Sequence, residues 1–250
     1  MSVDAPIAGG DHERRAVLPP LVDDAPTVFV IDDDPALRKL ISKLLESSGR
    51  RVETFAAATD FLAAYQPTRT GCLVLDVRLP GMSGLALQER LSADSITLPI
   101  LVVTGYGDVP VAVQAMRQGA FDFIEKPFSG QLLVERIEAA LVEDRRRRAK
   151  RVTLEQIRAR RATLTSREKQ VMDFVVQGKP NKMVGQLLGL SPKTVEVHRS
   201  NVMKKMDADS LPDLVKMAVQ LGPEELAPGT QALAERRAPE ASHEAGHESS

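Results

Sequence analysis

Three consecutive carboxylates, Asp32, Asp33 and Asp34, follow the apolar run 28–31, and a fourth, Asp76, ends a second apolar run. Like charges this close repel one another and raise one another's pKa, so a positive charge is expected among them. Carboxylate oxygens without His or Cys are the ligands of a hard cation such as Mg²⁺, which keeps several waters and leaves room for phosphate oxygens. Such a site requires that the two apolar runs end at the same place in the fold.

The region 26–142 alternates short apolar runs with amphipathic segments. The runs expected to form strands are 27–31, 51–55, 71–76, 99–105 and 120–125. Nearly continuous apolar strands that alternate with helices predict a parallel sheet with helices on both faces. Five such units fit a flavodoxin-like α/β fold with strand order 2-1-3-4-5, in which the active crevice lies at the carboxyl ends of the strands.

Five polar side chains are expected to converge in this crevice. Asp32 and Asp33 end the first strand, Asp76 ends the third, Thr104 ends the fourth and Lys126 follows the fifth. Three acids, a hydroxyl and an amine therefore surround one point, and the oxygen ligands favour Mg²⁺ as the cofactor.

Asp34 is expected to have a different, structural role. It directly precedes Pro35 and an amphipathic segment. An acid before a proline at the first helical position is typical of a helix N-cap.

The composition indicates a globular chain of one or two domains. Its 250 residues are 43% apolar and 27% charged, enough to build a core, and the formal net charge of −1 means that any basic surface must be local. The single cysteine, Cys72, cannot form an internal disulfide and lies in an apolar run, where a buried thiol is expected. No secretory signal or membrane helix is apparent, so a cytoplasmic location without membrane contact is expected.

Composition changes along the chain predict five segments. Residues 1–25 are expected to be a disordered arm, 26–142 an α/β domain, 143–163 a strongly basic helical linker, 164–221 a second domain and 222–250 a disordered tail. The linker lacks an apolar stripe wide enough for a core helix. It is either a solvated connection or a basic segment that also contacts DNA phosphates.

The second domain, 164–221, is predicted to be a small all-α unit of four helices. Ser191 and Pro192 mark the start of its third helix, on which Val195, Val202 and Met206 should face the core. The outer face of that helix carries polar residues, and the unit holds nine Lys and Arg against six Asp and Glu. Helix, short turn and a second helix with an outward polar face is the helix-turn-helix arrangement, although a protein-binding helical module would share the apolar pattern.

Four fragments of the first domain carry a resemblance to a known family. "IDDDP", "LVLDVRLPGMSG", "VVTGYGDV" and "FDFIEKPF", in this order and at these spacings, resemble the receiver domain of bacterial two-component response regulators. The resemblance covers about residues 26–142. It implies a partner sensor histidine kinase and a phosphoryl group carried on an aspartate.

The resemblance assigns a role to each polar residue of the crevice. It implies that Asp76 is the phosphoacceptor and that Asp33, Asp76 and the backbone carbonyl of Arg78 hold Mg²⁺, with Asp32 positioning the ion through water. Thr104 and Lys126 would bind the phosphoryl oxygens, and the bond from Lys126 to Pro127 would be cis. A carboxylate that forms an acyl phosphate needs a metal and a cation to offset the accumulating negative charge.

Phe123 matches the switch aromatic of the receiver family. The resemblance implies that its ring moves inward when Thr104 turns toward the phosphoryl group, which repacks the surface around the fourth helix and fifth strand. A phenylalanine that only packs in the core is the alternative.

The second domain resembles the LuxR-type helix-turn-helix, through "LTSRE", "NK", "SPKTVEVHRSNV" and "KKM". Together the two domains resemble the FixJ/NarL regulators, with the FixJ branch the better match. Gly185 departs from the pattern, because the family usually has alanine there, and it should weaken the second helix by about 1 kcal/mol. The residues expected to contact DNA are Asn181, Lys182, Lys193, Thr194, Glu196, Val197, Arg199, Ser200 and Lys204.

The function predicted from these features is a phosphorylation-activated transcription regulator rather than a dedicated enzyme. Its expected partners are the histidine kinase, double-stranded promoter DNA and RNA polymerase, with a homodimer formed on phosphorylation. A phosphohydrolase that forms an aspartyl phosphate is the enzymatic alternative, but that class places its nucleophile after the first strand in a pattern that "IDDDPALR" does not match. A non-DNA adaptor is the third possibility.

Overall fold

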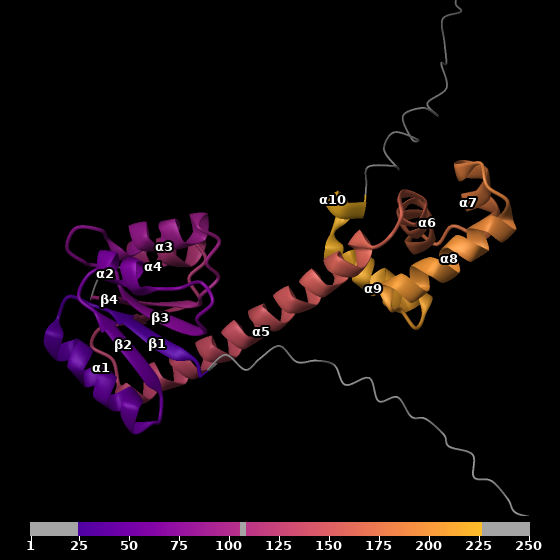
Figure 1. The fold of residues 1–250 in the computed structure, drawn as a ribbon. Helices are drawn as coiled ribbons and strands as arrows, with labels where there is room; N and C mark the ends of the chain where they lie inside the picture. Colours follow the sequence, from indigo (N-terminus) through magenta and orange to yellow (C-terminus); the bar gives the residue numbers. More distant parts are fainter. Residues whose placement is uncertain (1–24, 106–108, 227–250) are drawn as a thin grey trace, which may run out of the picture. The chain divides into compact units, whose positions relative to one another are not determined.

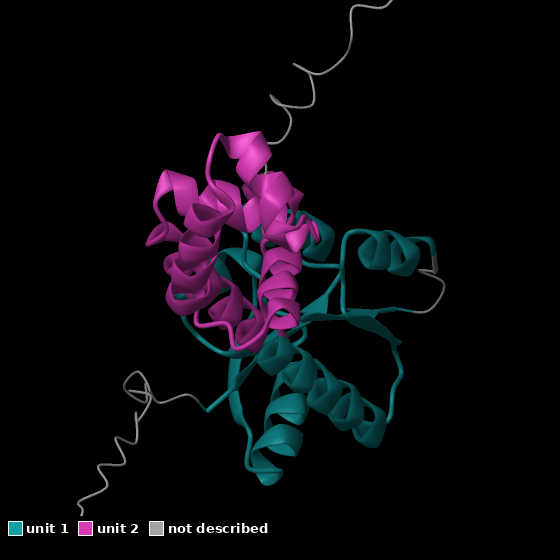
Figure 2. Cartoon of the chain, turned by 90° about the vertical axis from the view of Figure 1, so that its right-hand side faces the viewer, with its two compact units in different colours: residues 1–146 teal, residues 147–250 magenta. Residues whose placement is uncertain are grey.

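The computed structural model describes residues 25–105 and 109–226 (Figure 1). The chain divides into two compact units, residues 1–146 and 147–250 (Figure 2). Almost all of the expected arm 1–25 and tail 222–250 lies outside the described residues.

The first unit contains a five-stranded parallel sheet, as predicted. The strands are β1 (Thr27–Ile31), β2 (Arg51–Phe55), β3 (Gly71–Asp76), β4 (Ile100–Thr104) and β5 (Asp122–Glu125), in the order β2-β1-β3-β4-β5. Ile31 on β1 pairs with Leu75 on β3. The residues that follow these two positions, Asp32 and Asp76, therefore leave the sheet at the same edge.

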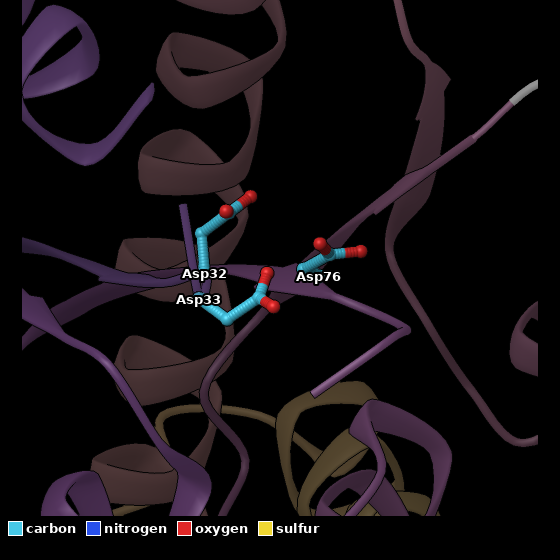
Figure 3. Close-up of side chains that lie close together, drawn as sticks. All are labelled: Asp32, Asp33 and Asp76. Atoms are coloured by element: carbon cyan, nitrogen blue, oxygen red, sulfur yellow. The ribbon is translucent and has the colours of Figure 1, made fainter. Parts of the chain in front are cut away.

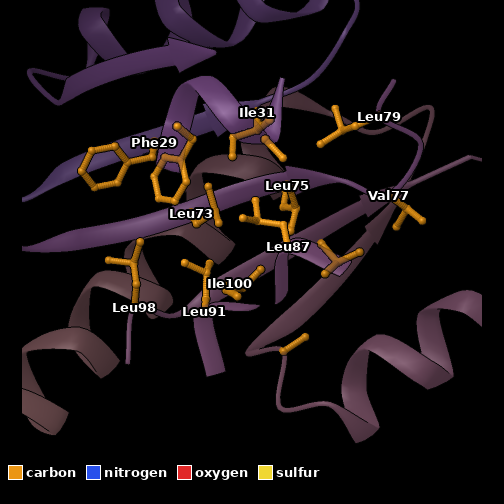
Figure 4. Close-up of a cluster of buried hydrophobic side chains, with 14 of the residues drawn as sticks. Phe29, Ile31, Leu73, Leu75, Val77, Leu79, Leu87, Leu91, Leu98 and Ile100 are labelled. Atoms are coloured by element: carbon orange, nitrogen blue, oxygen red, sulfur yellow. The ribbon is translucent and has the colours of Figure 1, made fainter. Parts of the chain in front are cut away.

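Five helices surround the sheet: α1 (Pro35–Ser47), α2 (Ala58–Ala64), α3 (Gly84–Ala93), α4 (Val109–Arg117) and α5 (Gly130–Ala162). Successive strand residues point to opposite faces. On β1, Phe29 and Ile31 therefore join one buried cluster with α2, α3 and α4, part of which is drawn in Figure 4. Val28 and Val30 join the other cluster, with α1 and α5. Helices therefore cover both faces of the sheet, and Asp32 and Asp76 lie at its carboxyl edge.

Two local features set the start of the helices near this edge. The Asp34 side chain accepts a hydrogen bond from the Ala36 amide at 2.8 Å, which confirms its predicted role as the α1 N-cap. Gly84 begins α3, and a Cβ there would come within 2.3 Å of the Asp76 backbone carbonyl oxygen. Only glycine fits this approach, so α3 begins directly against the backbone of the candidate phosphoacceptor.

The second unit contains α6 (Ser166–Val176), α7 (Asn181–Leu188), α8 (Pro192–Met206), α9 (Leu211–Leu221) and the short α10 (Pro223–Leu226). Ser191 caps α8 with Pro192 in its first turn, and Val195, Val202 and Met206 are buried, as predicted. The turn between α7 and α8 includes Gly189 in the left-handed region. These elements form the expected helix-turn-helix.

The structure departs from the expected linker and tail. α5 is one helix of 33 residues that runs through the basic segment. Near its end Ile157 is only 3% exposed and packs in the core of the second unit, so this part of the basic segment contributes to a domain core. The expected tail also begins with structure, because α10 forms and Leu226 packs against the same core.

Gly185 on α7 has a packing role that the sequence pattern did not predict. A Cβ at this position would come within 2.6 Å of the Leu190 carbonyl oxygen in the turn before α8. The Leu190 amide also donates to the Gly185 carbonyl at 2.9 Å. The glycine lowers helix propensity by about 1 kcal/mol, but it permits the close turn of the helix-turn-helix.

Candidate functional site

Three carboxylates meet at the carboxyl edge of the sheet (Figure 3). Asp32 and Asp33 follow β1 and Asp76 ends β3, and one oxygen atom from each lies within 4.8 Å of the others. Asp32 and Asp76 are buried, whereas Asp33 is exposed. The set offers only oxygen ligands and one open side, which fits a hard divalent cation that keeps several waters.

Asp32 is held from two directions. Its Oδ1 accepts from the Asp34 amide at 2.9 Å and its Oδ2 from Lys126 Nζ at 2.7 Å. Burial raises the pKa of Asp32 above its ordinary value, and the charge of Asp76 acts in the same direction. The hydrogen bonds from Lys126 and Asp34 oppose this shift only in part. Three carboxylates share the single Lys126 ammonium, so the cluster of Asp32, Asp33 and Asp76 carries more negative charge than this cation neutralises.

Lys126 is the cation that the three acids require. Its Nζ lies 2.9 Å from Asp76 Oδ2 as well as 2.7 Å from Asp32 Oδ2. Burial alone would lower the pKa of the Lys126 ammonium, but the two hydrogen bonds and the two negative charges outweigh burial and raise it. The ammonium therefore remains charged beside Asp76, whose Oδ1 accepts from the Arg78 amide at 3.2 Å.

Thr104 and the segment after β5 complete the crevice. Thr104 is buried at the end of β4, and its carbonyl accepts from the Lys126 amide at 2.7 Å. The Lys126–Pro127 bond is cis, as the family resemblance implied.

Phe123 lies on the surface, not in the core. Its side chain is 45% exposed, so the interpretation of Phe123 as a simple core residue is wrong. It lines an apolar groove on one face of α4 together with Ala112, Val113, Met116 and Arg117. An aromatic ring that is half exposed beside a helix can change its packing without opening the domain.

Sequence reasoning missed one contact at this site. Arg38 on α1 donates through Nη1 to the Asp32 backbone carbonyl at 2.6 Å. Its position four residues after the N-cap, on the helix turn that faces the strand end, was the available signal. Arg38 thereby fixes the backbone that carries the first two acids.

The second unit presents a polar outer face on α8. Most of the predicted DNA-contacting side chains are exposed there: Lys193, Thr194, Glu196, Val197, Ser200 and Lys204. Arg199 is half-buried, and its Nη1 lies 3.3 Å from Asn181 Oδ1 on α7. This contact links the two helices of the helix-turn-helix, and the remaining predicted residue, Lys182, is exposed on α7.

Two residues of α8 have contacts that narrow their roles. The Thr194 hydroxyl lies 2.8 Å from the Ser191 hydroxyl, so it also supports the N-cap. His198 is half-buried and its Nδ1 is shielded from solvent, so this side of the ring packs inward and away from the outer face of α8.

No helix in the described ranges 25–105 and 109–226 is both long and apolar enough to cross a membrane.

Comparisons with known proteins agree with this architecture. The family model for the response regulator receiver domain matches residues 28–138, and the model for bacterial regulatory proteins of the luxR family matches residues 162–218. The transcriptional regulatory protein FixJ of Azorhizobium caulinodans is 46% identical over 195 residues, which cover 78% of this chain and 92% of that protein.

Two solved structures are similar over both units. The response regulator StyR is 44% identical, with a TM-score of 0.67 over 78% of this chain and 99% of StyR. Full-length FixJ from B. japonicum is 43% identical, with a TM-score of 0.50 over 79% of this chain and 97% of FixJ. The acid cluster on a receiver fold and the attached helix-turn-helix match this family in both sequence and architecture. The chain belongs to the two-component response regulators that carry a LuxR-type DNA-binding domain, and it is a FixJ-like transcription regulator rather than a dedicated enzyme.

Proposed function

We propose that Asp76 accepts a phosphoryl group from a sensor histidine kinase and that this modification controls binding to promoter DNA. The observation that carries the proposal is the position of the Asp76 carboxylate, buried at the strand end with one oxygen on the Lys126 ammonium and two further acids beside it. In the transfer, an Asp76 oxygen attacks phosphorus, the phosphorus–nitrogen bond of phosphohistidine breaks, and the electron pair returns to the imidazole.

The acid cluster would hold Mg²⁺ during this reaction. Asp33, Asp76 and the Arg78 carbonyl would bind the ion directly, and Asp32 would position it through water. The oxygen-only donor set supports this assignment, and so does the presence of three carboxylates around one ammonium. Mg²⁺ would supply positive charge to the phosphoryl oxygens in the transition state.

Two side chains of the crevice would bind the phosphoryl group after transfer. Lys126 already lies 2.9 Å from Asp76, so its ammonium can pass from the carboxylate to a phosphoryl oxygen with little movement. The Thr104 hydroxyl would turn toward the same group. The space that Thr104 leaves would admit Phe123, whose exposed ring beside α4 supports a switch of this kind.

Phosphorylation would drive dimerisation through the face formed by α4 and β5. Val113, Met116 and Phe123 are exposed apolar side chains on this face, which supports its role as an interface. A dimer would place two copies of α8 on a two-fold symmetric promoter site. The bound dimer would then contact RNA polymerase.

On DNA, α8 would enter the major groove, with Glu196, Val197 and Ser200 near base edges. Glutamate can accept from the cytosine amino group and valine can pack on the thymine methyl. The DNA phosphates would be contacted by four cationic side chains: Lys193 at the start of α8, Lys182, Arg199 and Lys204. Asn181 and Thr194 would lie near the sugar-phosphate backbone of the DNA. The exposure of most of these side chains supports this assignment.

Label transfer tests the phosphoacceptor assignment. Asp76→Asn should abolish transfer of labelled phosphate from a phosphorylated histidine kinase and from a small phosphodonor, while the protein stays folded. Asp60→Asn, at an exposed acid on α2, is the matched control and should label like the wild type. An Asp76→Asn protein that labels as well as the wild type contradicts the assignment.

Sedimentation tests the dimer. With beryllium fluoride and Mg²⁺, the wild type should dimerise at concentrations where the unmodified protein is monomeric. Met116→Glu should prevent this dimer because it places charges on the apolar face. A modified protein that stays monomeric and still binds its promoter tightly contradicts this step.

A further inference from the structure

Gln88 lies on α3, the helix that begins against the backbone of Asp76, and its side chain is hydrogen-bonded to α4. It lies one helical turn after Gly84, whose amide donates to the Val77 carbonyl at 2.9 Å. A Cβ at Gly84 would clash with the Asp76 carbonyl, so the start of α3 lies directly against the backbone of Asp76. Gln88 is only 2% exposed, so its side chain lies in the packed interior.

The amide of Gln88 makes one hydrogen bond and lacks another. Its Nε2 donates to the Ala115 carbonyl at 2.9 Å, in the last turn of α4. The Ala120 amide donates to the same carbonyl at 3.0 Å and closes the helix end. Gln88 Oε1 is buried and has no hydrogen-bond partner among the described residues.

The buried Gln88 amide does not increase the overall stability of the first unit. A buried polar atom without a partner costs free energy, whereas an apolar side chain of similar size would pack without that cost. Leu87 and Leu91 on either side already belong to the same buried apolar cluster as Ala115 and Ala120. The specific effect of Gln88 is thus its single hydrogen bond to the end of α4.

The opposite side of α4 carries the exposed groove. Ala115 is fully buried, whereas Val113 and Met116 are exposed and line the groove beside Phe123. A displacement of α4 as a unit would therefore change both the Gln88–Ala115 hydrogen bond and the groove, because Ala115 and the groove residues Val113 and Met116 lie on one helix of nine residues.

We propose that Gln88 is a positioning residue that holds the end of α4 in its unmodified place and so opposes activation. The inference rests on the proposed function, in which phosphorylation repacks the α4 and β5 face. The hydrogen bond exists in the unmodified protein and would break when α4 repacks, so its removal would favour the activated arrangement. By linkage, whatever favours that arrangement also tightens binding of a phosphoryl mimic by the same factor.

The test uses Gln88→Met, which keeps length and volume and removes the amide. Loss of one neutral hydrogen bond predicts that the full-length variant binds beryllium fluoride, in saturating Mg²⁺, about fivefold more tightly than the wild type by calorimetric titration. Amide hydrogen exchange of the unmodified variant should be about fivefold faster at Ala120, which shares the Ala115 acceptor, and unchanged in β3. Gln88→Leu should behave in the same way.

Two controls separate positioning from loosened packing. Leu91→Val removes buried volume from α3 without touching the hydrogen bond, so it should lower stability and leave beryllium fluoride affinity unchanged. Glu89→Ala removes an exposed contact to Gln118 and should change neither quantity measurably.

The outcomes distinguish this inference from the proposed function. If wild type and Gln88→Met bind beryllium fluoride equally, the positioning role is wrong and the proposed function stands. If neither binds, the proposed function fails, and exchange at Ala120 alone decides whether Gln88 holds α4. Unchanged exchange at Ala120, or tighter binding by Leu91→Val as well, also overturns the inference.

Discussion

Asp173 on α6 should make the stability of the second unit depend on pH. The residue is only 4% exposed, and its Oδ1 has no hydrogen-bond partner among the described residues. The nearest cation, Arg161 Nη2, lies 3.8 Å away, beyond hydrogen-bond range. Burial raises the pKa of Asp173 to about 6, and the charge of Arg161 offsets this only in part.

The sign of the pH dependence of stability follows from the raised pKa of Asp173. A carboxyl group whose pKa is higher in the folded than in the unfolded protein binds a proton on folding, so stability falls as pH rises through the folded value. The pKa of Asp173 rises from 3.8 to about 6. At about 1.4 kcal/mol for each pKa unit, the ionised Asp173 costs about 3 kcal/mol at neutral pH.

Asp173→Asn removes this cost because the amide never ionises. The variant should be more stable than the wild type by about 3 kcal/mol near pH 7 and by only about 1 kcal/mol near pH 4.5, where the wild-type group is largely protonated when folded. Calorimetric unfolding of the full chain between about pH 4.5 and pH 7 measures the difference in stability between the two proteins. Hydrogen exchange of the α6 amides shows that the difference belongs to the second unit. Asp209→Asn, at an exposed acid in the same unit, is the control and should change stability little at any pH.

Two results would refute this reasoning. Parallel pH profiles for the wild type and Asp173→Asn would mean that Asp173 titrates normally despite its burial. A variant less stable than the wild type at pH 7 would mean that attraction to Arg161 exceeds the cost of burial.

Three further predictions concern the two functional surfaces. Lys126→Met should destabilise the metal-free protein by about 3 kcal/mol, because it removes the cation paired with the buried carboxylates of Asp32 and Asp76. Mg²⁺ should then stabilise the variant more than the wild type in urea unfolding, and an equal response to Mg²⁺ contradicts this. Asp33→Ala should weaken Mg²⁺ binding and stop phosphorylation, whereas Asp34→Ala should cost about 1 kcal/mol of stability with phosphorylation retained. Similar Mg²⁺ titrations for the two variants would disprove the assignment of metal binding to Asp33 and helix capping to Asp34. Lys204→Ala should weaken binding to all DNA sequences and reduce by about 1 the slope of the logarithm of the binding constant against the logarithm of the salt concentration. Glu196→Ala should instead relax the base preference at one base pair. If Glu196→Ala weakens binding to all sequences equally, α8 docks differently from this proposal.

Much of the fold was predictable because the signals are local and periodic. The apolar runs that end in Asp32 and Asp76 form adjacent strands β1 and β3, since continuous apolar strands separated by helices can only be buried in a parallel sheet. The caps at Asp34 and Ser191 were equally legible, because the capping side chain, the proline and the helix are neighbours in sequence. The convergence of the acids with Lys126 followed from this topology.

Features that depend on contacts between distant segments were decided only by the tertiary structure. The sequence alone indicates that Phe123 is apolar, but its exposure depends on how α4 lies beside β5. The basic run in α5 suggested a solvated linker, yet Ile157 is buried because α6 to α9 provide a core for it. The Gln88–Ala115 hydrogen bond and the raised pKa of Asp173 follow the same rule. A side chain's partners and its dielectric surroundings depend on the packed fold and leave no periodic signal in the sequence.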